Sequence, residues 1–228
     1  MIGIIGAMDI EVAGIKALLC DVSSKNISGV EFVLGKYKNE DVVVAKCGIG
    51  KVFAALCTEA MILSFAPDMI INVGIAGALD KTLDVGDVVI ASHVLQHDMD
   101  TSPLGDPVGL LSGINIIEIP ADEKLVSGLT RAAEALSLPH KIGKIATGDQ
   151  FVATKEQKKT IVENFGAASC EMEGGAIGQV CYVNSVPFCV LRTMSDKADG
   201  DAHIDYPTFC KTAADNNIGI IKAFLNQI

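Results

Sequence analysis

Four carboxylates in this chain stand where short apolar segments end. Glu11 follows the run GIIGAM, Glu171 and Glu173 fall in SCEMEGGA, and Asp196 closes LRTMSD. In an open α/β sheet, ligands collect where strands end and helices begin, so acidic side chains from three such edges can converge on one pocket. Each carboxylate alone could instead be a helix cap or an N-terminal charge. As a set, they indicate a site at which carboxylates take part in chemistry.

Arginine is scarce, which makes the position of Arg192 informative. It lies four residues before Asp196 on the same apolar segment, and the only other arginine, Arg131, falls on an expected surface helix. The spacing fits a functional role for Arg192 and a structural ion pair equally well.

The secondary structure predicted for the segments that carry these side chains alternates between strands and helices, which is typical of an α/β fold. Near-continuous apolar, β-branched runs predict strands covered on both faces, at residues 2–5, 42–46, 69–73, 88–91, 142–146 and 188–191. Helix-like stretches follow at residues 51–65, 121–136, 155–164 and 174–183, and an amphipathic helix is expected at 207–226. The Gly-, Pro- and Ser-rich segment 101–113 is too long for a simple connector and is interpreted as a functional loop.

Length, charge and cysteine content narrow the class of protein. A chain of 228 residues, 50% of them hydrophobic, fits a single domain over residues 1–228. The net charge of -10 argues against nucleic acid as a partner. No basic segment precedes the apolar start, and no run approaches the roughly 18 apolar residues of a membrane span. The seven cysteines are scattered without a C-x-x-C pair, which favours buried reduced thiols and a cytoplasmic location.

Three other motifs have weaker functional readings. GIIGAM lacks the G-x-G-x-x-G spacing of a dinucleotide-binding turn, and GIGK at residues 48–51 lacks the first glycine and the hydroxyl residue of a phosphate-binding loop. His97, Asp98 and Asp100 could be assembled into a metal site, but no further histidine falls at ligand spacing, and a hydrogen-bonded strand end is the better interpretation. We therefore expect neither a cofactor nor a metal.

Seven segments, taken in chain order, resemble the 5'-methylthioadenosine/S-adenosylhomocysteine nucleosidases of the nucleoside phosphorylase-like superfamily: GAMDIEV, KCGIGKV, INVGIAGAL, VGDVVIA, TGDQFVA, CEMEGGAI and VPFCVLRTMSDKAD. The likeness runs from Ile2 to the final helix. It implies a three-layer α/β/α fold around a mixed central sheet, of the phosphorylase/hydrolase-like type. It also implies hydrolysis of the N-glycosidic bond of an adenine thionucleoside, and a homodimer in which the partner subunit closes the pocket for the 5' group.

The resemblance assigns a role to each matched position. Glu11 matches the general base that activates water, Arg192 matches the arginine that helps to place this water, Glu173 matches the carboxylate that binds the ribose hydroxyls, and Asp196 matches the acid that protonates adenine N7. The other matched positions are expected to contact or support the substrate: Met8, Ile49, Gly77, Phe151, Val152, Glu171, Met172, Ser195 and Tyr206.

The implied chemistry needs both an acid and a base. Adenine anion is a poor leaving group, so a positioned acid must neutralise it as the C–N bond breaks and the sugar becomes oxocarbenium-like. Burial can keep a carboxyl protonated near neutral pH for this purpose. An ionised carboxylate on the opposite face would deprotonate water, as in an inverting glycosidase.

Three alternatives remain open. A hydrolase for an aminofutalosine-type nucleoside would share every catalytic residue named. A purine nucleoside phosphorylase would have to hold phosphate, usually with arginines, which this chain hardly offers. A nucleoside sensor would keep the pocket but would not need an acid and a base together. Ile75 also departs from the family pattern, since many members carry a hydroxyl residue there to help hold the water.

Overall fold

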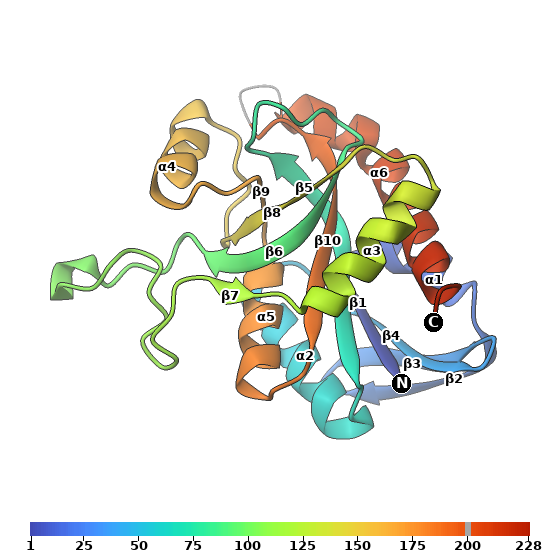
Figure 1. Ribbon diagram of the computed structural model, residues 1–228. Coiled ribbons are helices and arrows are strands. Elements are labelled where there is room, and N and C mark those ends of the chain that lie inside the picture. The colour runs from blue at the N-terminus through green and yellow to red at the C-terminus, as the bar shows by residue number, and fades with distance from the viewer. Residues whose placement is uncertain (199–201) are drawn as a thin grey trace.

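The computed structural model describes the backbone of residues 1–198 and 202–228, and the side chains of residues 1–198 and 208–228. A mixed sheet lies at the centre and helices cover both of its faces (Figure 1). Its strands are β1 (Ile2–Gly6), β2 (Cys20–Ile27), β3 (Val30–Tyr37), β4 (Glu40–Lys46), β5 (Met69–Ala78), β6 (Val88–Gln96), β7 (Ile119–Pro120), β8 (His140–Thr147), β9 (Ser169–Glu171) and β10 (Phe188–Asp196). The helices are α1 (Asp9–Lys16), α2 (Lys51–Phe65), α3 (Glu123–Ala135), α4 (Lys155–Phe165), α5 (Gly174–Val183) and α6 (Ala202–Leu225), with a short 3₁₀ turn η1 (Ser102–Leu104).

Part of the sheet closes on itself. β5 and β10 pair in parallel, β10 pairs antiparallel with β6, β6 and β9 both pair in parallel with β8, and β9 returns antiparallel to β5. The remaining strands form an open wing, in which β1 joins β5 to β4 and the antiparallel strands β3 and β2 follow. Several strands therefore end around one opening, which brings distant segments together.

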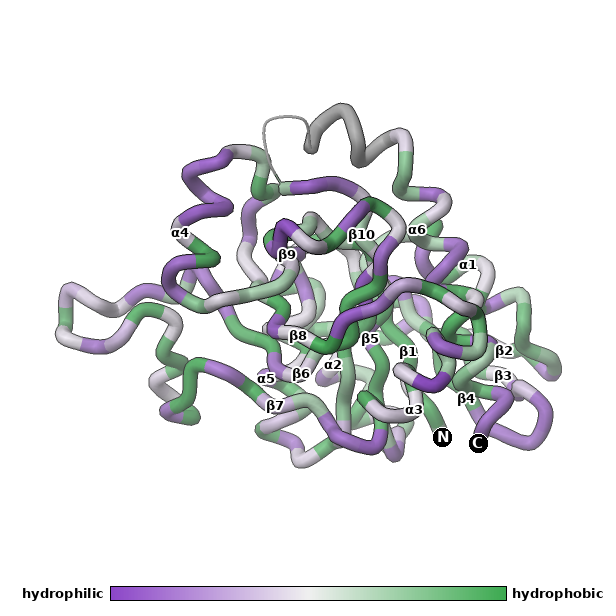
Figure 2. Tube along the Cα trace, turned by 45° about the horizontal axis from the view of Figure 1, so that its top comes forward, coloured by the Kyte–Doolittle hydropathy of each residue, from purple (hydrophilic) through white to green (hydrophobic). Residues whose placement is uncertain are grey.

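Helices complete the three layers. α6 packs between α1 and α3, and the three cover one face, while α2 and α5 pack together on the other. Hydropathy follows this arrangement, since the central strands are mostly apolar and the outlying α4 is mostly polar (Figure 2). No helix in the described part of the chain is long and apolar enough to cross a membrane. The expected three-layer α/β/α fold with a mixed sheet is confirmed.

Capping side chains explain where several helices begin. The carboxylate of Asp122 accepts hydrogen bonds from the backbone N–H groups of Lys124 and Leu125, both at 3.0 Å, and this N-cap starts α3. Thr154 caps α4 in the same way, with Gln157 bonding back to the Thr154 backbone. These helix starts are set by local sequence.

All six predicted strands are present, but the sequence patterns missed β2, β3, β7, β9 and α1. β2 is exposed along almost its whole length, so it carries no continuous apolar run. β7 and β9 are too short for any periodic pattern. The last helix begins at Ala202, earlier than the predicted start at residue 207.

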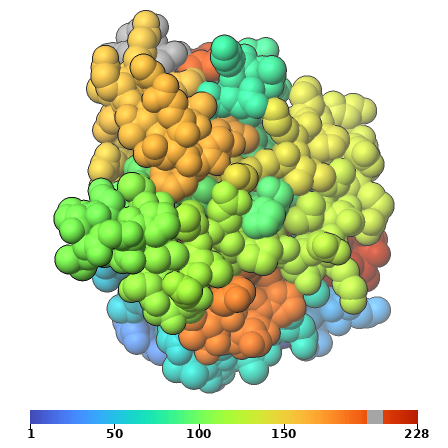
Figure 3. Space-filling model, turned by 60° about the vertical axis from the view of Figure 1, so that its left-hand side comes forward, coloured from blue at the N-terminus to red at the C-terminus, as the bar shows by residue number. Residues whose placement is uncertain are grey.

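The segment between β6 and β7 extends away from the body, and we call residues 99–118 the arm (Figures 1 and 3). It contains η1 and an isolated bridge between Leu111 and Ile116. Leu104 on η1 is 84% exposed. The expectation of a long irregular segment at residues 101–113 is confirmed, while its function is not tested by the fold.

Candidate active site

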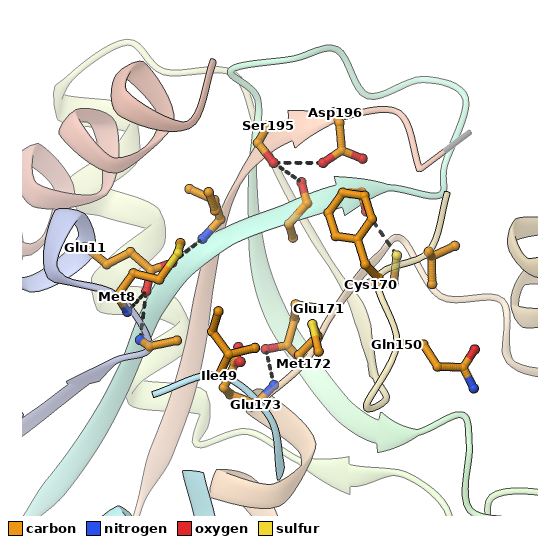
Figure 4. A pocket seen from close by; sticks show the side chains of 16 residues that line it. Met8, Glu11, Ile49, Gln150, Cys170, Glu171, Met172, Glu173, Ser195 and Asp196 are labelled. Carbon is orange, nitrogen blue, oxygen red and sulfur yellow. Dashed lines mark hydrogen bonds between the residues drawn. The ribbon is translucent and has the colours of Figure 1, made fainter. Parts of the chain in front are cut away.

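A cavity opens at the ends of β1, β5, β9 and β10 (Figure 4). Most of the side chains singled out from the sequence line it: Met8, Glu11, Ile49, Gly77, Phe151, Val152, Glu171, Met172, Glu173, Ser195 and Asp196. The lining also includes residues for which no contact with substrate was expected: Ala7, Ile75, Ala76, Gln150 and Cys170. The predicted carboxylates are therefore brought together in one place.

Glu11 lies in the first turn of α1 and folds back over the start of its own helix. One carboxylate oxygen accepts hydrogen bonds from the N–H groups of Ala7 (2.7 Å) and Met8 (2.9 Å), and the other accepts from Ile75 (3.1 Å). The side chain is almost fully buried. Burial raises the pKa of Glu11, while the charge of Arg192 and these three amides act in the opposite direction. Glu11 is therefore an acidic residue of a helix N-terminus, and it also lines the cavity, while its catalytic role stays a prediction.

Arg192 lies behind the cavity wall, 1% exposed, and is absent from the lining. One guanidinium nitrogen, Nη2, donates to Asn72 Oδ1 at 2.7 Å and to a carboxylate oxygen of Glu171, and it lies 3.6 Å from Glu173. The ion pair that the sequence left open is thus made, with Glu171 as its closest carboxylate. In this position Arg192 binds the carboxylates of Glu171 and Glu173. The role that the resemblance implies for it, placing the attacking water, stays a prediction.

Glu171 is the most heavily hydrogen-bonded carboxylate of the site. It accepts from the Thr147 hydroxyl, from Arg192, and from the backbone N–H groups of Glu173 (3.1 Å) and Gly174 (2.7 Å). Glu171 therefore anchors the start of α5 and, through it, Glu173.

Glu173 is the N-cap residue of α5, and its side chain points at the loop after β4. Its Oε1 accepts a hydrogen bond from the N–H of Gly50 at 2.9 Å. The pKa of Glu173 is raised to about 7. Burial is the largest cause, the negative charge of Glu171 acts in the same direction, and Arg192 acts against it. A carboxyl with this pKa exchanges its proton near neutral pH.

Asp196 ends β10 on a different side of the cavity from Glu11 (Figure 4). The Ser195 hydroxyl donates to one oxygen at 2.9 Å, and the Ala198 N–H donates to the other at 2.8 Å. A Cβ atom at Gly77 would come within 2.9 Å of this carboxylate, so only glycine leaves room for it. The separation of the two carboxylates allows them to act on different atoms of one ligand.

Tyr206 lies in the stretch whose side chains the structure does not describe, so its expected place in the pocket lies outside the described residues.

Sequence reasoning missed several residues that support the site. Asn72 is a buried polar residue in an apolar strand, which is a usable signal because such a group must find a partner. Thr147 and Gly50 carried no such signal, since their roles depend on which loops meet. Cys170 lines the cavity, and burial raises the pKa of its thiol, so it contributes an uncharged wall.

The residues of the rejected metal and phosphate motifs are hydrogen-bonded to one another and to neighbouring backbone. The Lys51 ammonium donates to Asp98 at 2.7 Å and to Gln96 at 3.2 Å, and Asp98 also accepts from the N–H of Asp149. Asp100 accepts from the N–H of Ser102. These contacts favour a structural reading of both motifs.

The chain belongs to the phosphorylase superfamily, whose family model matches residues 1–226. The chain is 42% identical to the 5'-methylthioadenosine/S-adenosylhomocysteine nucleosidase of Shewanella halifaxensis, with 100% of this chain and 99% of the relative covered. It belongs to the 5'-methylthioadenosine/S-adenosylhomocysteine nucleosidase family.

Two solved structures bear on the substrate. The nucleosidase from Colwellia psychrerythraea, in complex with adenine, is 38% identical and superposes with a TM-score of 0.95 over 99% of this chain and 94% of that chain. The futalosine hydrolase of Helicobacter pylori is 35% identical, with a TM-score of 0.96 over 100% of this chain and 97% of that chain. Both activities thus occur on nearly the same backbone.

Proposed function

We propose that this chain hydrolyses the N-glycosidic bond of 5'-methylthioadenosine and S-adenosylhomocysteine, releasing adenine and the thioribose sugar. We choose water rather than phosphate as the nucleophile because the cavity is lined by acidic side chains. Glu11, Glu171, Glu173 and Asp196 line it, and no lysine or arginine is among the described lining residues. Such a surface repels a phosphate dianion and accepts a neutral nucleoside.

The carboxylates divide the reaction between them. Glu11 takes a proton from a water molecule as the oxygen of this water attacks C1' of the sugar. The C1'–N9 bond breaks, its electron pair goes to adenine, and Asp196 delivers a proton to N7. Glu173 accepts hydrogen bonds from the ribose hydroxyls and favours the positive charge that develops on the sugar. Phe151 and Met172 supply the apolar surface against which base and sugar pack.

A phosphorylase is the weaker alternative, because neither arginine is available to phosphate. Arg192 is buried against Glu171 and Glu173. Arg131 lies on α3, where its guanidinium is close to Gly128 on the outer helical layer. The specific arginine forks that bind phosphate oxygens are therefore missing from this pocket.

An aminofutalosine-type nucleoside is the stronger rival substrate. The structural likeness to the futalosine hydrolase is as high as the likeness to the adenine-bound nucleosidase, and the acid and base would be the same. Only the group at the 5' position separates the two substrates.

A substrate panel tests both questions. The protein is incubated with methylthioadenosine, adenosylhomocysteine, aminofutalosine and inosine, with and without phosphate, and the free base and the sugar product are measured. We expect adenine release from the two thionucleosides at the same rate with and without phosphate, and much slower turnover of inosine, whose 6-oxo group reverses the hydrogen-bond pattern at the base. A sugar 1-phosphate as main product would overturn the hydrolase assignment.

We further propose a homodimer whose partner subunit completes the 5' pocket. In support, one side of α2 exposes Val52 (77%), Phe53 and Leu63, and Leu104 is exposed on the arm. Exposed apolar side chains of this kind are typical of an interface. Light scattering should give twice the chain mass of 23.9 kDa.

The proposed location is the cytoplasm. Five of the seven cysteines are buried thiols that form no disulfide, as expected in a reducing compartment. Cell fractionation followed by detection of the protein checks this.

A further inference from the structure

One peptide group of β5 connects Glu11 to the far side of the molecule. The N–H of Ile75 donates to Glu11 Oε1 at 3.1 Å. The carbonyl of the same peptide group, Gly74 C=O, accepts a hydrogen bond from Asn217 Nδ2 at 2.6 Å. The two ends of a single peptide unit therefore bind the active-site carboxylate and a side chain of α6.

The orientation of the Asn217 amide is fixed from its other end. Asn217 is 0% exposed, and its Oδ1 accepts a hydrogen bond from the Thr193 hydroxyl at 2.8 Å. Thr193 is also fully buried, on β10. With a donor on its oxygen and an acceptor on its nitrogen, the amide has no alternative orientation that keeps both bonds.

The donors in this chain of hydrogen bonds all point the same way. Thr193 donates to Asn217, Asn217 donates to the Gly74 carbonyl, and the linked N–H of Ile75 donates to Glu11. A hydrogen bond accepted by a peptide carbonyl polarises the whole peptide unit and strengthens the donor at its N–H end, and a low dielectric enhances the effect. The last bond of the series ends on a carboxylate, where a stronger donor stabilises the charged form.

We propose that Asn217 is a positioning residue for Glu11: through the Gly74–Ile75 peptide it orients and polarises the amide that holds the water-activating carboxylate. The proposal rests on the proposed role of Glu11 as general base. It assigns a part in catalysis to a residue of α6 that is not among the described lining residues and whose hydrogen bonds go to Thr193 and to the Gly74 carbonyl.

Other groups also act on Glu11, and they set the background for a test. Arg192 on β10 favours its charged form, while Glu173 at the start of α5 and Glu11 repel each other when both are charged. The buried thiol of Cys47, after β4, also interacts electrostatically with Glu11. The Ala7 and Met8 amides donate to Glu11 as well. All of these groups are unchanged when Asn217 is replaced.

The test compares Asn217→Leu with Asn216→Leu. Leucine is close to asparagine in size but cannot donate to the Gly74 carbonyl. Asn216 is a matched control, because its side chain also donates to a backbone carbonyl, that of Gly86 at 3.4 Å, from the same helix and without a link to Glu11. For each variant we would measure kcat and KM for methylthioadenosine against pH, and the midpoint of thermal unfolding.

In Asn217→Leu we expect kcat to fall about tenfold, as for loss of one hydrogen bond to a charged group, with KM within about twofold of the parent value. The acid limb of the kcat profile should move to higher pH, because a weaker Ile75 donor raises the pKa of Glu11 and ionisation of the base then needs a higher pH. Asn216→Leu should keep the parent kcat and the parent profile.

Three outcomes would overturn the proposal: an unshifted acid limb in Asn217→Leu, a loss carried only by KM, or the same change in Asn216→Leu. If Asn217→Leu does not fold, Thr193→Val decides, since it keeps the volume and removes only the bond that orients Asn217, and a smaller shift in the same direction is expected. Glu11→Gln is measured in parallel. If Glu11→Gln keeps its turnover, the proposed role of Glu11 as the base is wrong. If Glu11→Gln is inactive while Asn217→Leu behaves as wild type, only the proposed role of Asn217 is wrong.

Discussion

Glu11, Glu173 and Asp196 are all buried, but each accepts hydrogen bonds from different groups. Glu11 has three backbone amides and Arg192 near by, and Glu173 has the Gly50 amide and a like charge from Glu171. Asp196 has one hydroxyl and one amide donor. Different surroundings give carboxyl groups different affinities for a proton, and the proposed division into a base, Glu11, and an acid, Asp196, depends on this.

Opposite roles for Glu11 and Asp196 can be separated with the leaving group. Glu11→Gln removes the base and should reduce kcat by roughly 10²- to 10⁴-fold while substrate still binds. Asp196→Asn should cause a comparable loss with adenine nucleosides, because the amide cannot transfer a proton. A nucleoside with an intrinsically good leaving group should restore turnover in Asp196→Asn and not in Glu11→Gln, as measured by steady-state kinetics. Equal restoration in both variants would contradict the assignment.

The raised pKa of Glu173 should make stability depend on pH. Between the ordinary value of 4.5 and about 7, the folded state keeps a proton that the unfolded state has lost, so the free energy of unfolding falls as pH rises through this window. The slope from this group is at most about 1.4 kcal/mol per pH unit. Urea unfolding at several pH values should show a flatter dependence for Glu173→Gln than for wild type. Glu163→Gln, on the exposed face of α4, is the control and should keep the wild-type dependence.

Among the elements, the start of α2 is tied to two loops that border the cavity. Lys51 bonds to Asp98 after β6 through its ammonium group and to Asp149 after β8 through its N–H. The preceding residue, Gly50, donates to Glu173. The Lys51–Asp98 pair is mostly buried, so it is screened less than the ion pairs on the surface.

Lys51→Met should loosen these loops. We expect KM to rise several-fold and the unfolding free energy to fall by about 1–3 kcal/mol, because Asp98 loses its partner in a mostly buried place. Lys36→Met removes an ion pair with Asp41 that is exposed on the β3–β4 hairpin, and it should change stability by less than about 1 kcal/mol and leave KM unaltered. Kinetics and urea unfolding of both variants check this. Equal effects would show that Lys51 has no special connection with the cavity.

At the scale of the whole molecule, the exposed apolar side chains of α2 and the projecting arm are the surfaces at which we propose that a second subunit binds. Val52→Glu places a charge in the proposed interface and should shift the protein from dimer to monomer in sedimentation experiments. Val22→Glu is the matched control, since Val22 is exposed on the edge strand β2. We expect Val22→Glu to remain dimeric. A dimer that persists in Val52→Glu would exclude this side of α2 from the interface.

The sequence by itself determined the elements whose signal is local. Apolar runs marked six strands, most of which are covered on both faces, because burial on both sides requires nearly every residue to be apolar; β8 is buried only at its end. The order of motifs indicated the family and the pocket residues, and the carboxylates at the strand ends indicated where the pocket would be.

The tertiary structure alone decided how these residues act on one another. Three of the hydrogen bonds join residues that are far apart in the sequence. Ile75 donates to Glu11, 64 positions away. Arg192 donates to Asn72 over 120 positions, and Asn217 donates to Gly74 over 143. Such contacts depend on the closure of β5, β10, β6, β8 and β9 into a ring and on the placement of α6 against it. Periodicity reports only on residues a few positions apart, so it shows that a side chain is buried without showing which distant group will meet it.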